Sequence, residues 1–260
     1  MPIRDVLLAL LVVAIWGFNF VVIKLGLEDV PPLLLTALRF VFAAVPAVFF
    51  LRRPACPWQW VVLFGFVLGV VKFGLLFVGM KLGMPAGLSS IVLQLQAFFT
   101  IALAVPLLGE RPKAIQLVGA LVAMGGVGLI ALARTSGASL AGASLGPFLM
   151  VVGAAACWGL ANIVTKKAGK VDMLAFVVWG SLVPPLPLLG LSWIFEGGPA
   201  IGAALAHPSL TGILSVAYLA GPTTLFGFGV WSALLSRHPA ATVAPFSLLV
   251  PIFGLSSAAL

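Results

Sequence analysis

Long apolar runs separated by short polar segments dominate the pattern of this chain. A helix needs about 20 apolar residues to cross the roughly 30 Å hydrocarbon core of a bilayer. Charged residues, prolines and glycines divide the chain into runs near that length. The pattern therefore predicts nine membrane-spanning helices, at residues 6–26, 33–51, 59–80, 86–108, 113–133, 146–166, 173–195, 210–235 and 240–260. The seventh contains Pro-Pro-Leu-Pro at 184–187, which predicts a kink.

The basic residues between these runs predict the orientation of the chain. With the N-terminus in the cytoplasm, nine of the Lys and Arg residues fall on the cytoplasmic side and three on the other, as the positive-inside rule expects. The cytoplasmic set is Arg4, Arg52, Arg53, Arg111, Lys113, Lys166, Lys167, Lys170 and Arg237, and the opposite set is Lys24, Lys81 and Arg134. We therefore expect a cytoplasmic N-terminus.

Composition supports the same picture. The chain is 62% hydrophobic and only 8% charged, whereas soluble domains are roughly 45–50% apolar and about 25% charged. Lipid must therefore be the solvent for most of this surface. The formal net charge of +8 does not indicate a nucleic-acid partner, because the basic residues form no stripe with interleaved aromatic residues. The two cysteines give no disulfide framework, and both are expected to be unpaired.

Two sequence motifs occur twice along the chain. AIWGFNFVVIKLG at 14–26 resembles CWGLANIVTKKAG at 157–169, and MPAGLSS at 84–90 resembles HPAATVA at 238–244. The first and sixth predicted helices are then equivalent, as are the fourth and ninth, so the repeat is five helices long. Because five is odd, the two copies enter the membrane from opposite sides. Such inverted repeats are typical of secondary transporters, whose substrate site lies between the halves.

The repeat defines the expected domain organisation. The first copy is expected at residues 1–135 and the second at 144–260, which lacks an equivalent of the fifth helix. We therefore expect an all-α polytopic membrane protein with inverted five-helix repeats, nine spans of an expected ten. This interpretation predicts that the sequence is a fragment of a longer, ten-helix protein.

Four segments carry a resemblance to a known family. WGFNFVVIKLGL at 16–27, PPLLLTALRF at 31–40, GMPAGLSSIVLQLQAFFT at 83–100 and GERP at 109–112 are similar to the EamA family of the drug/metabolite transporter superfamily. The resemblance covers the whole chain and is greatest to members that export O-acetylserine and cysteine. It implies a central cavity lined by the first, third, fourth, sixth, eighth and ninth spans, with efflux to the periplasm.

These observations together predict an inner-membrane exporter of small amino acid metabolites that works by alternating access. The alternatives are an exporter of other solutes, such as drugs or aromatic metabolites, and a structural membrane subunit without transport. An enzyme is not expected, because the sequence has no HExxH motif, paired aspartates or buried Ser–His arrangement. No metal or cofactor is expected. The expected partners are a small-molecule substrate and the lipid bilayer, with the chain as a monomer or homodimer.

Lys72 is the candidate with the clearest chemistry. It lies about thirteen residues into the predicted helix 59–80, where an ammonium costs about 2.5–3.5 kcal/mol to insert. None of the six acidic residues lies near the middle of a predicted helix. Lys72 either pairs with backbone carbonyls or a water defect, or faces a cavity and attracts a substrate carboxylate. We favour the second interpretation, because no neighbouring acid neutralises the charge.

Two other basic residues have a simpler explanation. Arg39 lies near the outer end of the predicted helix 33–51, from which its side chain is expected to snorkel to the interface. Direct contact with substrate is the alternative. Lys24 lies near the outer end of 6–26 and is expected to be an interfacial anchor.

Polar residues in the fourth predicted helix supply further candidates. Gln94 and Gln96 are two residues apart, so a regular helix places them on nearly opposite faces, whereas Ser90 and Gln94 share a face. We therefore expect Ser90 and Gln94, rather than Gln96, to line the cavity.

The repeated motif supplies the remaining candidates. Asn19 either contacts substrate or hydrogen-bonds another helix. Trp16 and Trp158 lie in mid-span, away from the interfacial belt where tryptophan usually anchors, so each walls the cavity or packs between the repeats. The complete set of expected substrate-binding residues is Trp16, Asn19, Lys72, Ser90, Gln94, Trp158, Asn162, Tyr218, Trp231 and Ser247.

Overall fold

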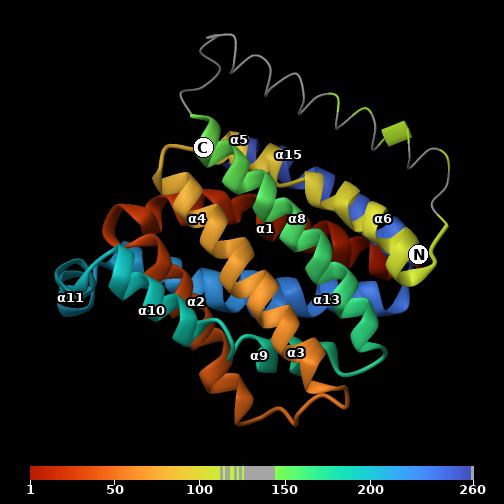
Figure 1. Ribbon diagram of the computed structural model, residues 1–260, viewed down its shortest axis with the longest axis horizontal. Coiled ribbons are helices and arrows are strands. Elements are labelled where there is room, and N and C mark those ends of the chain that lie inside the picture. The colour runs from red at the N-terminus through yellow and green to blue at the C-terminus, as the bar shows by residue number, and fades with distance from the viewer. Residues whose placement is uncertain (112–113, 115–117, 120–121, 123–124, 126–143, 259–260) are drawn as a thin grey trace.

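The computed structural model describes residues 1–111, 114, 118–119, 122, 125 and 144–258. These residues form helices joined by turns, without a strand, and the long helices lie side by side in a bundle (Figure 1). The fifth predicted helix, 113–133, falls almost entirely outside the described residues. The helices are α1 (Ile3–Asp29), α2 (Pro32–Val48), α3 (Trp58–Phe64), η1 (Gly65–Lys72), α4 (Phe73–Lys81), α5 (Ala86–Val92), α6 (Leu95–Leu108), α8 (Leu145–Ala168), α9 (Met173–Gly180), α10 (Pro185–Phe195), α11 (Gly198–Ala206), α12 (Leu210–Tyr218), η2 (Leu219–Phe228), α13 (Gly229–Arg237), α14 (Ala240–Val243), η3 (Ala244–Leu249) and α15 (Val250–Ala258).

Six helices in the described part of the chain are long and apolar enough to cross a membrane. They coincide with six of the predicted spans and cover Ile3–Asp29, Trp58–Lys81, Ala86–Leu108, Leu145–Ala168, Met173–Phe195 and Leu210–Arg237. The predicted spans at 33–51 and 240–260 correspond to shorter apolar helices, Pro32–Val48 and Ala240–Gly254. Large hydrophobic side chains such as Phe42 and Trp193 are exposed on the outside of the bundle, as expected for surfaces that face lipid tails.

Several of the spans are interrupted, and the interruptions have local causes. The seventh breaks between α9 and α10, at Ser181–Pro184, so the kink predicted there is confirmed. The fourth breaks at Leu93 and Gln94, between α5 and α6, and the ninth contains the 3₁₀ segment η3, which includes Pro245. A π-helix occupies the middle of the third span (η1) and of the eighth (η2), where Pro222 removes a backbone donor. Segments of this kind are frequent at functional sites.

Both copies of the Trp-Gly motif lie at close helix contacts. A Cβ added at Gly17 would lie 2.4 Å from Cβ of Phe253 in α15, and one at Gly159 would lie 2.7 Å from Cβ of Phe99 in α6. Only glycine allows backbones to approach this closely. The motif of α1 thus packs on α15, and the motif of α8 packs on α6. Close helix packing therefore accounts for the glycine of each motif. The role of the tryptophans, Trp16 and Trp158, depends on their contacts inside the bundle.

Candidate functional site

A small cavity lies between the spans at the level of the two tryptophans. It is lined by Trp16, Asn19 and Phe20 of α1, Lys72 of η1, Phe73 and Leu76 of α4, Leu93, Trp158 of α8, Thr223 and Phe228 of η2, and Val250 of α15. These residues lie in the first, third, fourth, sixth, eighth and ninth of the predicted spans. The cavity holds about 20 Å³, which is room for about one water molecule.

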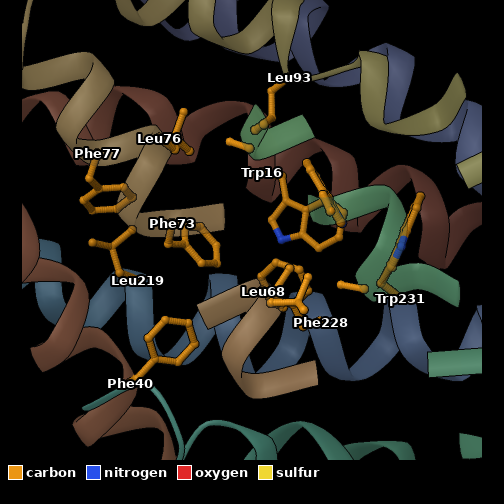
Figure 2. Packing of buried hydrophobic residues seen from close by; sticks show 14 of the residues in the cluster. Trp16, Phe40, Leu68, Phe73, Leu76, Phe77, Leu93, Leu219, Phe228 and Trp231 are labelled. Atoms are coloured by element: carbon orange, nitrogen blue, oxygen red, sulfur yellow. The ribbon is translucent and has the colours of Figure 1, made fainter. Parts of the chain in front are cut away.

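Five of the eleven residues that line the cavity are aromatic, and Figure 2 shows three of them, Trp16, Phe73 and Phe228, packed together. The ring of Trp16 lies at the centre of this aromatic cluster, with its centroid 5.1 Å from Trp158, 4.9 Å from Phe228 and 5.1 Å from Trp231. The Trp16–Trp158 pair meets edge to face, at 73°, a favoured geometry for aromatic rings. The tryptophans of the two Trp-Gly motifs therefore contact each other inside the bundle, and both line the cavity.

Lys72 points its ammonium into this aromatic cluster. Its side chain is 2% exposed, and Nζ lies 3.4 Å from the ring centroid of Phe73 and 4.6 Å from that of Trp158. Cation–π contacts of this kind stabilise a desolvated ammonium by about 2 kcal/mol. No hydrogen-bond acceptor or acidic side chain among the described residues pairs with Nζ. Lys72 is thus a cavity-lining cation that lacks an anionic partner.

A free hydrogen-bond donor accompanies this cation. The indole Nε1 of Trp158 is buried and has no hydrogen-bond partner among the residues that the structure describes, whereas that of Trp16 donates to the Thr223 carbonyl at 3.2 Å. The Thr223 hydroxyl donates to Oδ1 of Asn19 at 3.1 Å. Buried polar groups are normally satisfied, so the unpaired N–H of Trp158 beside Lys72 marks a place that accepts an anion or a water molecule.

A polar network behind the cavity holds three other candidates. The Asn162 amide donates to Oε1 of Gln96 at 2.9 Å and its Oδ1 accepts from the Trp231 indole at 3.2 Å. The Gln96 amide in turn donates to the Ser247 hydroxyl. None of Asn162, Trp231, Ser247 and Gln96 lines the cavity. The asparagines of the two motifs are offset by one position in the alignment, and their surroundings differ. Asn19 lines the cavity, whereas Asn162 of α8 bonds to Gln96 of α6 and Trp231 of α13.

The remaining candidates lie away from the cavity. Gln94 donates to the backbone carbonyl of Ser90 at 2.9 Å, and Ser90 donates to the carbonyl of Gly87. The helix breaks at Gln94, so the regular helical spacing used to separate Gln94 from Gln96 does not apply across this segment. Tyr218 is half-buried and its hydroxyl donates to the Ile15 carbonyl at 2.9 Å, which ties the eighth span to the first.

Arg39 requires a correction. The expectation that it snorkels to the interface is wrong, because its side chain has no exposed surface. Its Nε donates to the Thr224 hydroxyl at 2.7 Å, and its guanidinium carbon lies 4.0 Å from the ring centroid of Phe73. The packing of α2 against η2 turns the Arg39 side chain inward. Arg39 and Thr224 are 185 positions apart in the sequence, so the sequence pattern does not reveal this contact. Lys24, in contrast, is exposed as expected for an anchor.

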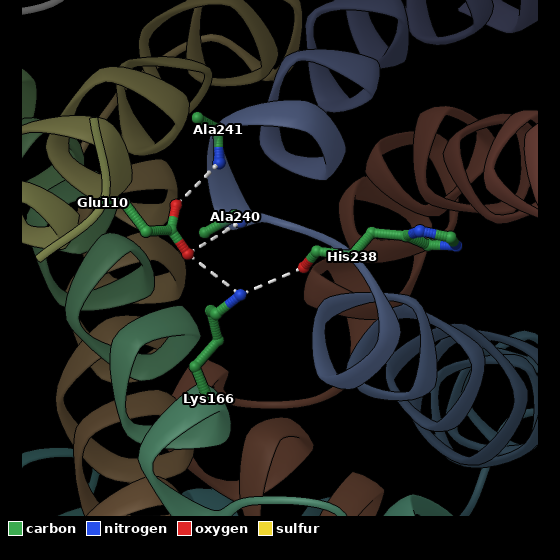
Figure 3. Close-up of polar contacts among 5 residues, drawn as sticks. All are labelled: Glu110, Lys166, His238, Ala240 and Ala241. Atoms are coloured by element: carbon green, nitrogen blue, oxygen red, sulfur yellow. Dashed lines mark hydrogen bonds and ion pairs between the residues drawn. The ribbon is translucent and has the colours of Figure 1, made fainter. Parts of the chain in front are cut away.

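One end of the bundle is closed by a cluster of polar contacts (Figure 3). Glu110, after α6, forms an ion pair with Lys166 at 2.9 Å and accepts from the backbone N–H groups of Ala240 and Ala241 at the start of α14. Lys166 also donates to the His238 carbonyl. The His238 ring contacts Asp5 of α1 at 2.6 Å. Because Asp5 lies at the beginning of α1 and Lys166 near the end of α8, these two helices run in opposite directions.

A second carboxylate closes the other end of the bundle. Glu196, after α10, accepts from the backbone N–H groups of Leu33 and Leu34 at 2.6 and 3.1 Å, at the start of α2. The Ser192 hydroxyl donates to the same carboxylate at 2.6 Å. Each end of the bundle is therefore held by a glutamate that caps the first turn of a distant helix, a favourable place for negative charge.

A larger hollow of about 710 Å³ lies on the periphery, between α9 and α13. Its wall includes the exposed hydrophobic side chains Leu174 and Phe226. Its lining also includes the charged residues Lys170, Asp172 and Arg237. The central cavity is the candidate site, because it lies between the helices and contains the unpaired indole N–H of Trp158.

Comparison with known proteins places this arrangement in a family. The EamA-like transporter family matches residues 4–132 and 145–260. The chain belongs to the EamA-like transporter family. Two relatives, from Salmonella typhimurium and Escherichia coli, each bear the name "Probable amino-acid metabolite efflux pump". They are 44% and 42% identical to this chain over 98% and 99% of its length, and the matches cover 86% of each relative.

A solved crystal structure has a similar fold. It superposes with a TM-score of 0.70 at 22% identity, covering 98% of this chain and 86% of the other. Family membership and the apolar helices together establish this EamA-like chain as a multi-pass membrane transporter.

Proposed function

We propose that this protein is an inner-membrane exporter of small amino acid metabolites of the O-acetylserine and cysteine type. The observation that carries the proposal is the pairing of Lys72 and Trp158 in the central cavity. The ammonium of Lys72 and the free N–H of Trp158 are two donors suited to one substrate carboxylate. The names of the two efflux-pump relatives support the same substrate class.

Inverted five-helix repeats are part of the proposal. The family match in two segments supports it, as does the opposite direction of α1 and α8. The irregular segments support it too, because the π-helices lie in the third and eighth spans and the interruptions of α5–α6 and α14–α15 lie in the fourth and ninth. Under the proposed repeat, these spans are equivalent pairs. The basic end that contains Lys166 is then the cytoplasmic end, and the N-terminus is cytoplasmic.

Alternating access follows from the size of the cavity and the contacts at the two ends. Small-molecule sites generally enclose roughly 300–1,000 Å³, whereas this cavity holds about 20 Å³. The described conformation is therefore closed, and substrate entry requires one end to open. The carboxylate contacts of Glu110 and Glu196 are the two closures, and alternate release of one or the other exposes the cavity to one side at a time.

Uptake into vesicles tests the proposal directly. Inverted membrane vesicles containing the protein should accumulate O-acetylserine or cysteine, and Lys72→Gln should reduce this flux about tenfold or more, because a carboxylate loses its charged partner. Lys24→Gln is the matched control, since Lys24 is an exposed cation in the same bundle. If Lys72→Gln leaves the flux of every carboxylate substrate unchanged, the proposed site is wrong.

The aromatic wall of the cavity favours a second candidate function. Trp16, Trp158, Phe73 and Phe228 line the cavity with aromatic rings, which pack well with planar aromatic metabolites. Adding aromatic amino acids to the uptake panel separates the two candidates. Faster uptake of the aromatic compounds than of O-acetylserine would favour the second.

A further inference from the structure

The peripheral hollow between α9 and α13 is lined by an apolar stripe that ends at a cation. Phe226, Val230, Ala233 and Arg237 all belong to its lining. Their spacings of four, three and four residues place them along one face of the eighth span. The first three are apolar and the last is an arginine, so the hollow combines an apolar surface with a positive charge at one end.

A second cation lies at the same end of the hollow. Lys170, in the connection between α8 and α9, lines it together with Arg237, and both side chains are exposed. Neither belongs to an ion pair among the described residues. Arg237 interacts electrostatically with Asp5, but the Asp5 carboxylate already contacts the His238 ring at 2.6 Å. Two cationic groups are therefore available to a ligand at this end.

One carboxylate also lines the hollow, and it is already used as a helix cap. Oδ1 of Asp172 accepts from the backbone N–H groups of Leu174 and Ala175, at 3.0 and 3.1 Å, in the first turn of α9. With two cations and this one carboxylate, the lining carries a net charge of +1. A ligand with a single negative charge would neutralise it.

The length of the apolar stripe matches one leaflet of a bilayer. Phe226 and Arg237 are separated by about 16 Å along the span at a helical rise of 1.5 Å per residue. Half of the hydrocarbon core of a bilayer is about 15 Å. Leu174 and Phe226 are 42% and 37% exposed, so the hollow is accessible from the outside of the bundle. A charged head group at Arg237 would therefore place its acyl chain along the whole stripe.

We propose that this hollow binds an anionic phospholipid with one net negative charge, of the phosphatidylglycerol type. The phosphate lies between Lys170 and Arg237, which donate charge-assisted hydrogen bonds to it, and an acyl chain packs along Phe226, Val230 and Ala233. Basic pockets between membrane helices are known binding sites for anionic head groups. The ligand is a component of the membrane and not the transported substrate, so this inference goes beyond the proposed function.

Native mass spectrometry of the detergent-solubilised protein provides the test. The protein is titrated with phosphatidylglycerol and with phosphatidylethanolamine of the same acyl chains, which has a phosphate but no net charge. Wild type should bind phosphatidylglycerol about tenfold more tightly or more. The double variant Lys170→Gln/Arg237→Gln should lower the affinity for phosphatidylglycerol about tenfold or more, because the phosphate loses both charged partners.

Two further variants separate the head group from the acyl chain. Lys24→Gln/Arg52→Gln removes two exposed cations that lie outside the hollow, and should leave the affinity unchanged. Ala233→Phe keeps the charge but fills the apolar stripe, so it should also weaken phosphatidylglycerol binding. The melting temperature of each variant without added lipid shows that its fold is retained.

Several outcomes would overturn the proposal. Equal affinity of wild type for the two lipids would do so, as would an unchanged affinity in the Lys170→Gln/Arg237→Gln variant. An equal loss in the control variant would assign the preference to overall charge. Displacement of the lipid by inorganic phosphate would leave only a site for a free anion, and loss of a homodimer in place of lipid would assign the hollow to a second copy of the chain. The assay contains no transported substrate, so each of these results would leave the proposed exporter standing.

Discussion

Gly159→Ala tests whether the Trp-Gly motif exists to bring α8 against α6. A Cβ at this position would lie 2.7 Å from Cβ of Phe99 and 2.9 Å from the backbone N of Thr100. The backbone atom cannot rotate away, so the helices must separate. Ordinary van der Waals contact begins at 3.4 Å. The added Cβ and Cβ of Phe99 must therefore move about 0.7 Å further apart, in a region packed as closely as a protein core.

The same shift strains the polar network one turn further along α8. Asn162 donates to Gln96 and Thr100 at 2.9 Å each, and the separation lengthens these bonds beyond the distance at which they are effective. Overpacking costs about 1–3 kcal/mol, and each lost interhelical hydrogen bond in a membrane costs about 0.6 kcal/mol. We therefore expect Gly159→Ala to lower the free energy of unfolding by about 2–4 kcal/mol.

Reversible unfolding in mixed micelles, followed by helix signal, measures this loss. Gly190→Ala in α10 is the matched control, because a Cβ there meets nothing within 4 Å and alanine is the better helix former by about 1 kcal/mol. Gly17→Ala should behave like Gly159→Ala, since its Cβ would lie 2.4 Å from that of Phe253. Equal stability of Gly159→Ala and wild type would refute the packing argument.

Three further predictions concern polar groups. Trp158→Phe keeps the ring but removes the unpaired N–H, so the KM for a carboxylate substrate should rise about tenfold. Glu110→Gln removes the 2.9 Å ion pair with Lys166. Melting experiments at low salt should show that the free energy of unfolding falls by about 1 kcal/mol. An equal fall at high salt would contradict an electrostatic origin. Burial raises the pKa of the Cys56 thiol, so in a Cys157→Ala background its maleimide labelling should stay slow until the pH exceeds the ordinary thiol value. Above that value only the unfolded thiol ionises, so Cys56 should make the fold less stable as pH rises; labelling as fast as in the SDS-unfolded chain would refute the burial.

The long helices and the kink were predictable because they depend on local sequence. Apolar length against bilayer thickness locates the spans, and Pro184 and Pro185 remove backbone donors wherever they occur. Sequence alone also located four of the cavity residues, Trp16, Asn19, Lys72 and Trp158. Each is a polar or aromatic residue in the middle of a long apolar run, which is costly unless an interior position accepts it.

The surroundings of these residues were not predictable, because they depend on contacts between distant segments. Arg39 is close enough to a helix end to reach the interface, and only its packing against Thr224 and Phe73 turns it inward. The helix break at Gln94 invalidates an angular argument that assumes an unbroken helix. Hydrophobic periodicity contains no signal for either feature, since both arise from how one span meets another.

The two tryptophans that the repeated motif aligns differ in their hydrogen bonds. The indole of Trp16 donates to the Thr223 carbonyl, whereas that of Trp158 has no hydrogen-bond partner among the described residues. Two halves with identical conformations would present the cavity equally to both sides of the membrane. A repeat protein can alternate its access only if the halves adopt unlike conformations that can exchange. The unequal hydrogen bonding of the two tryptophans is such a difference, and it lies at the site where the proposed mechanism requires one.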